Sequence, residues 1–216
     1  MKIFIDTANI GEIREACSWG IIDGVTTNPS LVAREKRPYE EVVREICELV
    51  SGPVSAETVG MDADTIVDEG LRLAAIHEQI AVKVPIMKEG LKAIRRLAAE
   101  GVKVNTTLVF SPMQALLAAK AGTAFISPFV GRLDDVSQFG MEGIEQIVTI
   151  LENYDYPAEI IVASVRSPIH VLQSALMGAH IATVPFSVLE KLYRHPLSDA
   201  GIEKFLADHK KIPTSS

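Results

Sequence analysis

The feature that most constrains this chain is an alternation, repeated eight times, of a short apolar segment and a longer segment with helical periodicity. The strand-like segments cover residues 2–6, 21–26, 53–57, 80–85, 102–108, 124–129, 159–165 and 180–184. Helix-like segments follow them at residues 9–19, 39–50, 62–77, 89–99, 111–120 and 137–152, after Ser167 and after Ser187, and a last helix covers residues 199–209. Strands separated by helices pair in parallel, because each helix returns the chain to the start of the next strand.

Eight such units favour an α/β fold of the (β/α)8 TIM-barrel type over the alternative, an open doubly wound sheet. No Gly-x-Gly-x-x-Gly fingerprint follows the first strand-like segment and no P-loop sequence occurs, which weakens the nucleotide-binding alternative. The length of 216 residues also suits one barrel, since single barrels commonly have about 200–250 residues. We therefore expect residues 1–216 to form a single domain with a C-terminal helix and an irregular tail over residues 212–216.

Short-range signals predict where several helices begin. A side chain that accepts a hydrogen bond from a free N–H group, often followed by proline or by an acidic residue three positions later, is typical of a helix start. The signals are Asn9 with Glu12, Ser111 before Pro112, Ser167 before Pro168, and Ser187 with Glu190.

Composition excludes several classes of protein. The net charge of −7 argues against general affinity for nucleic acid or for acidic membranes, because both depend on a basic surface. Asp6 interrupts the first apolar run and no later run approaches membrane-spanning length, so we expect a cytoplasmic protein. Cys17 and Cys47 fall on helical patterns and lack metal-ligand spacing, so they are interpreted as buried structural thiols and not as a disulfide or a metal site.

Lys83 is the residue that points to chemistry. It lies in an apolar segment with Val82 and Val84, and alternation along a strand places it on the opposite face from them. A buried ammonium must be paired or must lower its pKa, and a lysine with a lowered pKa is a nucleophile for carbonyl groups. The alternative is a lysine at a strand end whose charge reaches solvent.

Polar residues of seven strand-like segments share this inward phase and lie near the carboxyl ends, where barrel enzymes build their active sites. They are Asp6; Thr26 and Asn28; Ser55 and Glu57; Lys83; Asn105 and Thr107; Ser127, with Phe129 beside it; and Ser164 and Arg166. Any one of them has an ordinary structural role available, such as a helix cap, a core hydroxyl or a surface cation. Their common phase favours a functional interpretation of the set.

The set has a chemical logic. A lysine amine condenses with a ketone to an iminium, which draws electrons from the carbon–carbon bond that is then cleaved. This reaction needs a carboxylate and an acid or base that expels water, and Asp6 and Glu57 are available. Arg132 and Arg166, with Ser164, form a plausible phosphate clamp, because guanidinium matches phosphate in paired hydrogen bonds.

Five stretches carry a specific resemblance and extend over most of the chain. They are residues 4–8 (FIDTA), 24–30 (GVTTNPS), 81–85 (AVKVP), 105–110 (NTTLVF) and 127–132 (SPFVGR). In these stretches the sequence resembles the transaldolase family, and in particular its short single-barrel branch, which also contains fructose 6-phosphate aldolase.

The resemblance implies roles for individual residues. Lys83 is the implied Schiff-base residue, Asp6 the general acid/base at the cleaved bond, and Glu57 and Thr107 the pair around a water that serves imine formation. Donor-sugar contacts and the phosphate site are implied at Asn28, Asn105 and Ser127, with Thr26 and Phe129 beside them, and at Arg132, Ser164 and Arg166.

Within this branch, Phe129 and Glu57 stand where a tyrosine and a glutamine are expected of the aldolases. The resemblance therefore implies a transaldolase of the pentose phosphate pathway, which moves a dihydroxyacetone unit from a ketose phosphate (sedoheptulose 7-phosphate or fructose 6-phosphate) to an aldose phosphate (glyceraldehyde 3-phosphate or erythrose 4-phosphate). The alternatives are a fructose 6-phosphate aldolase and a non-catalytic barrel that binds sugar phosphates. No metal or organic cofactor is implied. A homo-oligomer, a pentamer or decamer, is implied, and Ile202, Phe205 and Leu206 form an apolar stripe on the last helix.

Overall fold

The computed structural model describes residues 1–212, so the expected tail over residues 212–216 falls outside the described residues except at its first position. The strands are β1 (Lys2–Asp6), β2 (Gly24–Thr26), β3 (Val54–Glu57), β4 (Ile80–Pro85), β5 (Val104–Val109), β6 (Phe125–Pro128), β7 (Glu159–Val162) and β8 (Ile181–Val184). The helices are α1 (Ile10–Ser18), α2 (Pro29–Arg34), α3 (Tyr39–Leu49), α4 (Ala63–Ala74), α5 (Lys88–Ala99), α6 (Pro112–Ala121), α7 (Val130–Asp134), α8 (Gly140–Asn153), α9 (Pro168–Leu176), α10 (Phe186–Leu192) and α11 (Pro196–His209).

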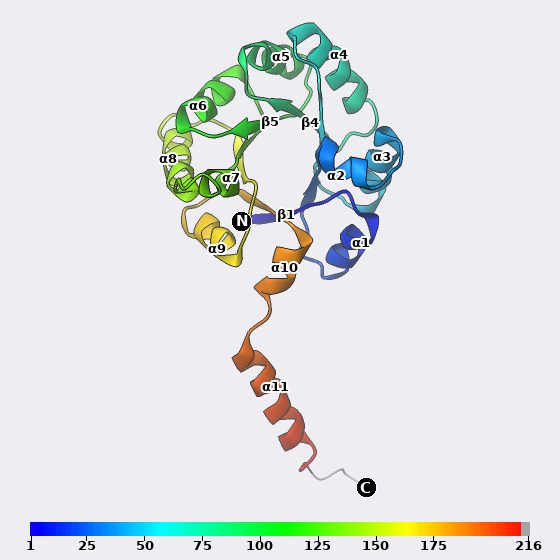
Figure 1. The fold of residues 1–216 in the computed structure, drawn as a ribbon, viewed down its shortest axis with the longest axis vertical. Helices are drawn as coiled ribbons and strands as arrows, with labels where there is room; N and C mark the ends of the chain where they lie inside the picture. The colour runs from blue at the N-terminus through cyan, green and yellow to red at the C-terminus, as the bar shows by residue number, and fades with distance from the viewer. Residues whose placement is uncertain (213–216) are drawn as a thin grey trace.

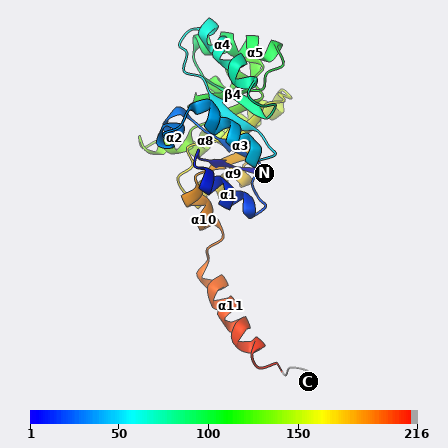
Figure 2. The ribbon, with the colours of Figure 1, turned by 90° about the vertical axis from the view of Figure 1, so that its right-hand side faces the viewer.

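The eight strands close into a parallel barrel in sequence order, and β1 pairs with β8. The (β/α)8 prediction is thus confirmed and the open-sheet alternative is wrong. Figure 1 looks into the ring of strands, with the helices outside it, and Figure 2 shows α11 leading away from the barrel. No residue of α11 is buried.

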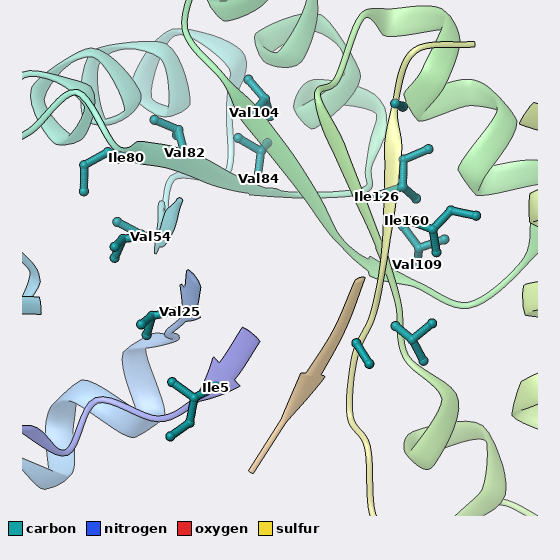
Figure 3. Packing of buried hydrophobic residues seen from close by; sticks show 14 of the residues in the cluster. Ile5, Val25, Val54, Ile80, Val82, Val84, Val104, Val109, Ile126 and Ile160 are labelled. Carbon is teal, nitrogen blue, oxygen red and sulfur yellow. The ribbon is translucent and has the colours of Figure 1, made fainter. Parts of the chain in front are cut away.

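Two apolar layers hold the barrel together, and they follow from alternation along the strands. Outward-facing β-branched residues such as Val82 and Val84 pack beneath the surrounding helices, and Figure 3 shows this layer around the ring. A second cluster of buried residues fills the barrel interior near the amino ends of the strands. Its members are Phe4, Ala81, Phe125, Ile161 and Ile181.

Most predicted helix starts are confirmed. The Asn9 side chain accepts a hydrogen bond from the N–H of Glu12, and the Ser111 side chain accepts one from Gln114. The reciprocal half of the first capping box is wrong, because the Glu12 carboxylate accepts from the Thr7 hydroxyl, 2.6 Å away.

The start predicted at Ser187 and Glu190 is also wrong. Helix α10 begins at Phe186, directly after Pro185, so Ser187 already lies in its first turn. A residue inside the first turn cannot accept from the free N–H groups ahead of it as a cap does. Pro185, with φ −57°, occupies the cap position and makes no side-chain hydrogen bond there.

Candidate active site

A cavity of about 280 Å³ opens at the carboxyl ends of the strands. Nine of the twelve predicted site residues line it: Asp6, Thr26, Asn28, Lys83, Ser127, Phe129, Arg132, Ser164 and Arg166. The other three lie beside it on the strands that flank β4: Glu57 is the last residue of β3, and Asn105 and Thr107 lie on β5. The structure therefore brings the predicted residues of separate strands to one end of the barrel.

Lys83 is buried and paired. Its register partners on the two adjacent strands are Glu57 and Asn105. The Lys83 Nζ atom lies 3.1 Å from Glu57 Oε2, and it donates a hydrogen bond to the carbonyl oxygen of Thr27, also 3.1 Å away. The two side chains of the ion pair are only 7% and 13% exposed. Charges in this position are shielded little by solvent, so the attraction between the ammonium and the carboxylate is stronger than between exposed groups.

Asp6 faces the same cavity from β1. Its Oδ1 atom accepts a hydrogen bond from the Thr26 hydroxyl, 2.8 Å away, and Thr26 also bonds the hydroxyl of Thr183 at 2.6 Å. Burial raises the pKa of the Asp6 carboxyl, while the charge of Lys83, the Thr26 hydrogen bond and the charge of Arg166 act in the lowering direction. A carboxyl whose pKa is raised retains a proton more readily, which suits an acid/base group.

A polar chain crosses the interior beside Lys83. Ser127 Oγ donates to Asn105 Oδ1 at 2.7 Å, and Asn105 Nδ2 donates to Ser55 Oγ at 3.0 Å. These bonds fix the amide of Asn105, which is fully buried. Thr107 Oγ1 differs: among the described residues it is the buried side-chain polar atom that has no hydrogen-bond partner. A buried polar atom in that state is a ready partner for a water or a ligand.

The two arginines lie on separate elements that approach each other closely. Any Cβ at Gly131 would clash with the carbonyl oxygen of Ser164, so glycine there lets α7 lie against the segment after β7. Ser164 itself has a φ of 59°, an uncommon conformation for a residue with a side chain. The Arg132 guanidinium stacks over the Phe129 ring, 5.0 Å from its centroid.

Neighbouring side chains orient Arg166. Its guanidinium pairs with Asp135 at 3.0 Å, and its backbone N–H donates to Nδ1 of His170, 3.2 Å away. His170 Nε2 in turn lies 2.8 Å from the Asp134 carboxylate. Asp134 and Asp135 belong to the same segment as Arg132. This one segment therefore carries Arg132 and also orients the guanidinium of Arg166.

Sequence reasoning missed several residues that line the cavity: Ser30, Leu31, Arg34, Thr183 and Pro185. Three of them lie on α2, a short helix; neither α2 nor α7 was predicted from the sequence. A signal for α2 was present, because Asn28 precedes Pro29 as Ser111 precedes Pro112. The Asn28 side chain accepts from Leu31 N–H at 3.0 Å.

The described residues give no sign of a second type of centre. Residues 1–212 contain no group of three or more His, Cys, Asp or Glu side chains placed to hold a metal ion. Cys17 and Cys47 are both free thiols; Cys47 is buried as predicted, whereas Cys17 is only half-buried. Burial raises the pKa of Cys47 to about 11. Across the same described range, no helix has the length and apolar character needed to cross a membrane.

The site combines a buried primary amine, two carboxylates and two guanidinium groups. An amine held among carboxylates can form an imine with a carbonyl compound when it is deprotonated, and a carboxylate can then remove a hydroxyl proton. The guanidinium groups suit a phosphate or carboxylate at the far end of the same molecule. This combination matches a phosphorylated ketose better than an uncharged ligand.

Comparisons with known proteins agree with this chemistry. The sequence model of the family described as Transaldolase/Fructose-6-phosphate aldolase matches residues 3–215. A protein of Aquifex aeolicus named "Probable transaldolase" is 59% identical over 213 residues, which is 99% of this chain and 98% of that protein. A protein of Geobacter metallireducens with the same name is 60% identical over 99% of this chain and 100% of its own.

Solved structures support the fold alone. The chain resembles a thiamine phosphate pyrophosphorylase from Pyrococcus furiosus with a TM-score of 0.61 and 16% identity, over 88% of this chain and 93% of that one. It also resembles a cube-shaped protein cage designed from fused symmetric oligomeric domains, with a TM-score of 0.63 and 15% identity, over 98% of this chain and 77% of that one. At such identities the likeness concerns the path of the backbone.

Proposed function

This chain belongs to the transaldolase/fructose-6-phosphate aldolase family, and from that premise we propose that it is a transaldolase acting through a Schiff base on Lys83. It transfers a dihydroxyacetone unit from sedoheptulose 7-phosphate or fructose 6-phosphate to glyceraldehyde 3-phosphate or erythrose 4-phosphate, as in the pentose phosphate pathway of the cytoplasm. The observation that carries the proposal is the buried Lys83 ammonium, 3.1 Å from the Glu57 carboxylate at the cavity that Asp6 lines.

The first step joins enzyme and donor sugar. Transfer of the Lys83 proton to Glu57 leaves a neutral amine, which attacks the ketone carbon and gives a carbinolamine. Protonated Glu57 then returns a proton to the departing hydroxyl, so that water leaves and the iminium forms. Thr107, whose hydroxyl has no partner among the described residues, is proposed to hold that water.

The second step breaks a carbon–carbon bond. Asp6 takes the proton of the hydroxyl on the carbon beyond the cleaved bond, and the electrons of that bond move to the iminium to give an enamine on Lys83. The aldose phosphate departs, an acceptor aldehyde takes its place, and the reverse steps produce the new ketose. Asp6 serves as base and then as acid, a cycle that its raised pKa assists.

Binding of the sugar is assigned to the remaining polar groups. Asn28, Asn105 and Ser127 are proposed to hold the hydroxyls of the donor, and the Ser127–Asn105 hydrogen bond of 2.7 Å supports a fixed geometry. Arg132, Arg166 and Ser164 are proposed to bind the phosphate. Asp135, 3.0 Å from the Arg166 guanidinium, orients it in the free enzyme and must share it when phosphate arrives.

Transfer and simple cleavage are distinguished by the fate of the enamine. Phe129 lines the cavity with a ring that carries no hydroxyl to pass on a proton, which favours waiting for an acceptor. The test is one coupled assay that compares transfer to erythrose 4-phosphate with release of free dihydroxyacetone from fructose 6-phosphate. We expect transfer to exceed release. If release dominates, the chain is an aldolase. If neither product forms, the alternative of a non-catalytic barrel that binds sugar phosphates stands.

A homo-oligomer of five or ten subunits belongs to the same proposal. Helix α11 leads away from the barrel and carries exposed apolar residues, among them Ile202, Phe205 and Leu206, which are 56–74% exposed. An apolar stripe of this kind needs cover, and a second copy of the chain is a partner of matching size. Light scattering is expected to give a multiple of 23.4 kDa; a monomer mass would contradict the assembly.

A further inference from the structure

A second cavity, of about 220 Å³, lies at the same end of the molecule as the main one. Its walls come from the first residues of α2 and α3, from the end of β3 and the loop after it, and from the second half of α4. Tyr39, Val59 and Leu73 give it an apolar lining, and Arg72 and Glu69 stand among them. Apart from Glu57, no residue that lines this side cavity has a role in the proposed reaction.

Glu57 connects the two cavities. It lines the side cavity, whereas its partner Lys83 lines the main cavity and is absent from the walls of the side cavity. The two charged groups are 3.1 Å apart. The Lys83–Glu57 pair therefore lies between the place where the sugar binds and a separate space that leads outward past Val59, which is 66% exposed.

The wall beside Glu57 is held by specific hydrogen bonds. The backbone N–H of Glu57 donates to the Tyr39 hydroxyl at 2.7 Å. The Glu69 carboxylate accepts from the N–H groups of Val59 and Gly60 at 2.8 and 3.0 Å. These bonds tie the loop after β3 to α3 and to α4, so the space beside Glu57 is a fixed feature and not a gap between loose side chains.

We propose that the side cavity is a water port, through which the water and proton handled by Glu57 exchange with solvent while sugar fills the main cavity. The proposal rests on the proposed function. During formation of the iminium, the bond from Lys83 nitrogen to carbon forms and the carbon–oxygen bond breaks. The former carbonyl oxygen takes one proton from the Lys83 nitrogen and a second from Glu57, and leaves as water. On release of the product, a water adds to the iminium carbon, Glu57 takes one of its protons and passes it to the Lys83 nitrogen, and the nitrogen–carbon bond breaks as the carbonyl forms.

The need for a port follows from where the sugar lies. A phosphorylated sugar bound between Lys83 and the two arginines occupies the main cavity and blocks that way to solvent. Water released beside Glu57 must then remain until the product forms or leave by another path. A volume of about 220 Å³ accommodates several waters, since each takes about 30 Å³ in the liquid.

The oxygen of the product reports which of these occurs. If the released water escapes through the port before the acceptor reacts, the new ketose carries an oxygen from solvent at its carbonyl. If the water stays, the product carries the oxygen of the donor. Mass spectrometry of the product formed in H₂¹⁸O measures the ¹⁸O gained per transfer, after subtraction of the uncatalysed exchange seen without enzyme.

Val59→Trp is the variant that fills the outer part of the port. Leu71→Trp is its matched control, because Leu71 is 40% exposed on the same helix that walls the cavity but does not line it. We expect wild type and Leu71→Trp to incorporate ¹⁸O equally and Val59→Trp to incorporate several-fold less per transfer. Should Val59→Trp fail to fold, Val59→Phe carries the same expectation with a smaller effect.

Two results would overturn the port. One is a filled variant that transfers and incorporates ¹⁸O as wild type does; the other is a wild-type product without solvent oxygen. Failure of the proposed function would be recognised differently, because wild-type enzyme would then form no transfer product in ordinary water or in H₂¹⁸O.

Discussion

The barrel interior has an apolar floor, near the amino ends of the strands, and a polar mouth, at their carboxyl ends. On three strands, the residue of the mouth follows the residue of the floor by two positions. On β1, β4 and β6 the floor residues Phe4, Ala81 and Phe125 are followed, two positions on, by Asp6, Lys83 and Ser127 at the mouth. Both layers face inward, since alternation returns each side chain to the same face every second residue. The floor is apolar, whereas the mouth concentrates charges that burial does not favour.

The difference separates stability from chemistry. Floor residues such as Phe4 and Ile161 are fully buried and stabilise the barrel through packing alone. Charged residues of the mouth lose their hydration on burial, and ion pairs such as Lys83–Glu57 offset part of that cost. Substitutions in the two layers should therefore affect different measured quantities.

The largest effect is expected for Lys83→Met at the mouth. Without the amine no covalent intermediate forms, so kcat for transfer should fall by about 10³-fold or more. Far-ultraviolet circular dichroism should show an intact barrel. Lys103→Met, at an exposed position before β5, is the control and should retain wild-type kcat. Comparable activity in both variants would remove Lys83 from the mechanism.

Phe4→Ala tests the floor, where we expect a loss of stability and little change in activity. Removal of a fully buried ring should lower the free energy of unfolding by about 3–5 kcal/mol, measured by urea denaturation. The kcat of the folded fraction should change little, because Phe4 does not line the cavity. A loss of kcat without a loss of stability would show that the two layers are not separable.

Arg166→Ala sharpens the account at the outer edge of the mouth. Each lost charge-assisted hydrogen bond is worth about 1.5–3 kcal/mol, so KM for phosphorylated substrates should rise tenfold or more. Unphosphorylated acceptors should be affected much less. Arg96→Ala, which removes an exposed pair with Asp64, is the control. Equal losses for both substrate types would place Arg166 outside the phosphate site.

Phe129→Tyr preserves the ring and adds one oxygen beside the proposed enamine. We expect release of dihydroxyacetone to rise relative to transfer, because a hydroxyl can position water or pass on a proton. About 1.4 kcal/mol of differential barrier already changes this ratio tenfold. The coupled assay measures it, and an unchanged ratio would reduce Phe129 to a packing residue.

The smallest effect concerns stability and pH at Asp6. Burial raises the pKa of this carboxyl, so the folded protein holds the proton more tightly than the unfolded chain and ionisation costs stability. That cost is absent below the ordinary aspartate pKa of about 3.9 and complete above the raised value. Asp6→Asn should melt higher than wild type at neutral pH, and the gap should close as the pH falls towards about 4.

Thermal melts at several pH values decide this prediction. A variant that melts lower than wild type at neutral pH would mean that the attraction between Asp6 and Lys83 outweighs the burial of the carboxylate.

The sequence predicted the barrel and most of its mouth, because both depend on local patterns. Alternation along β4 fixed the face of Lys83, and the register of parallel strands then put Glu57 and Asn105 beside it. The strand ends were predicted less accurately: β2 covers Gly24–Thr26, whereas the apolar pattern predicted a strand over residues 21–26. Ile21 and Ile22 are apolar but precede β2, and Asp23 contacts β1 through its backbone N–H, which donates to the carbonyl oxygen of Ile3.

Other features depend on contacts that local patterns do not encode. Arg34 reaches the cavity only because α2 folds back over the mouth. The pairs Arg166–Asp135 and His170–Asp134 join segments more than 30 residues apart. The apolar stripe on α11 was visible in the sequence, whereas the direction of the helix away from the barrel was not. A helix with such a stripe can pack on its own barrel or extend from it, and the sequence pattern is the same in both cases.

The central claim is that Lys83 carries the dihydroxyacetone unit, and borohydride reduction tests it most directly. Enzyme treated with fructose 6-phosphate and sodium borohydride should lose activity and gain the mass of a reduced dihydroxyacetone adduct. Digestion and peptide mass spectrometry should place that adduct on Lys83, and Lys83→Met should gain nothing. An adduct on another residue, or no adduct while wild type turns over, would contradict the account.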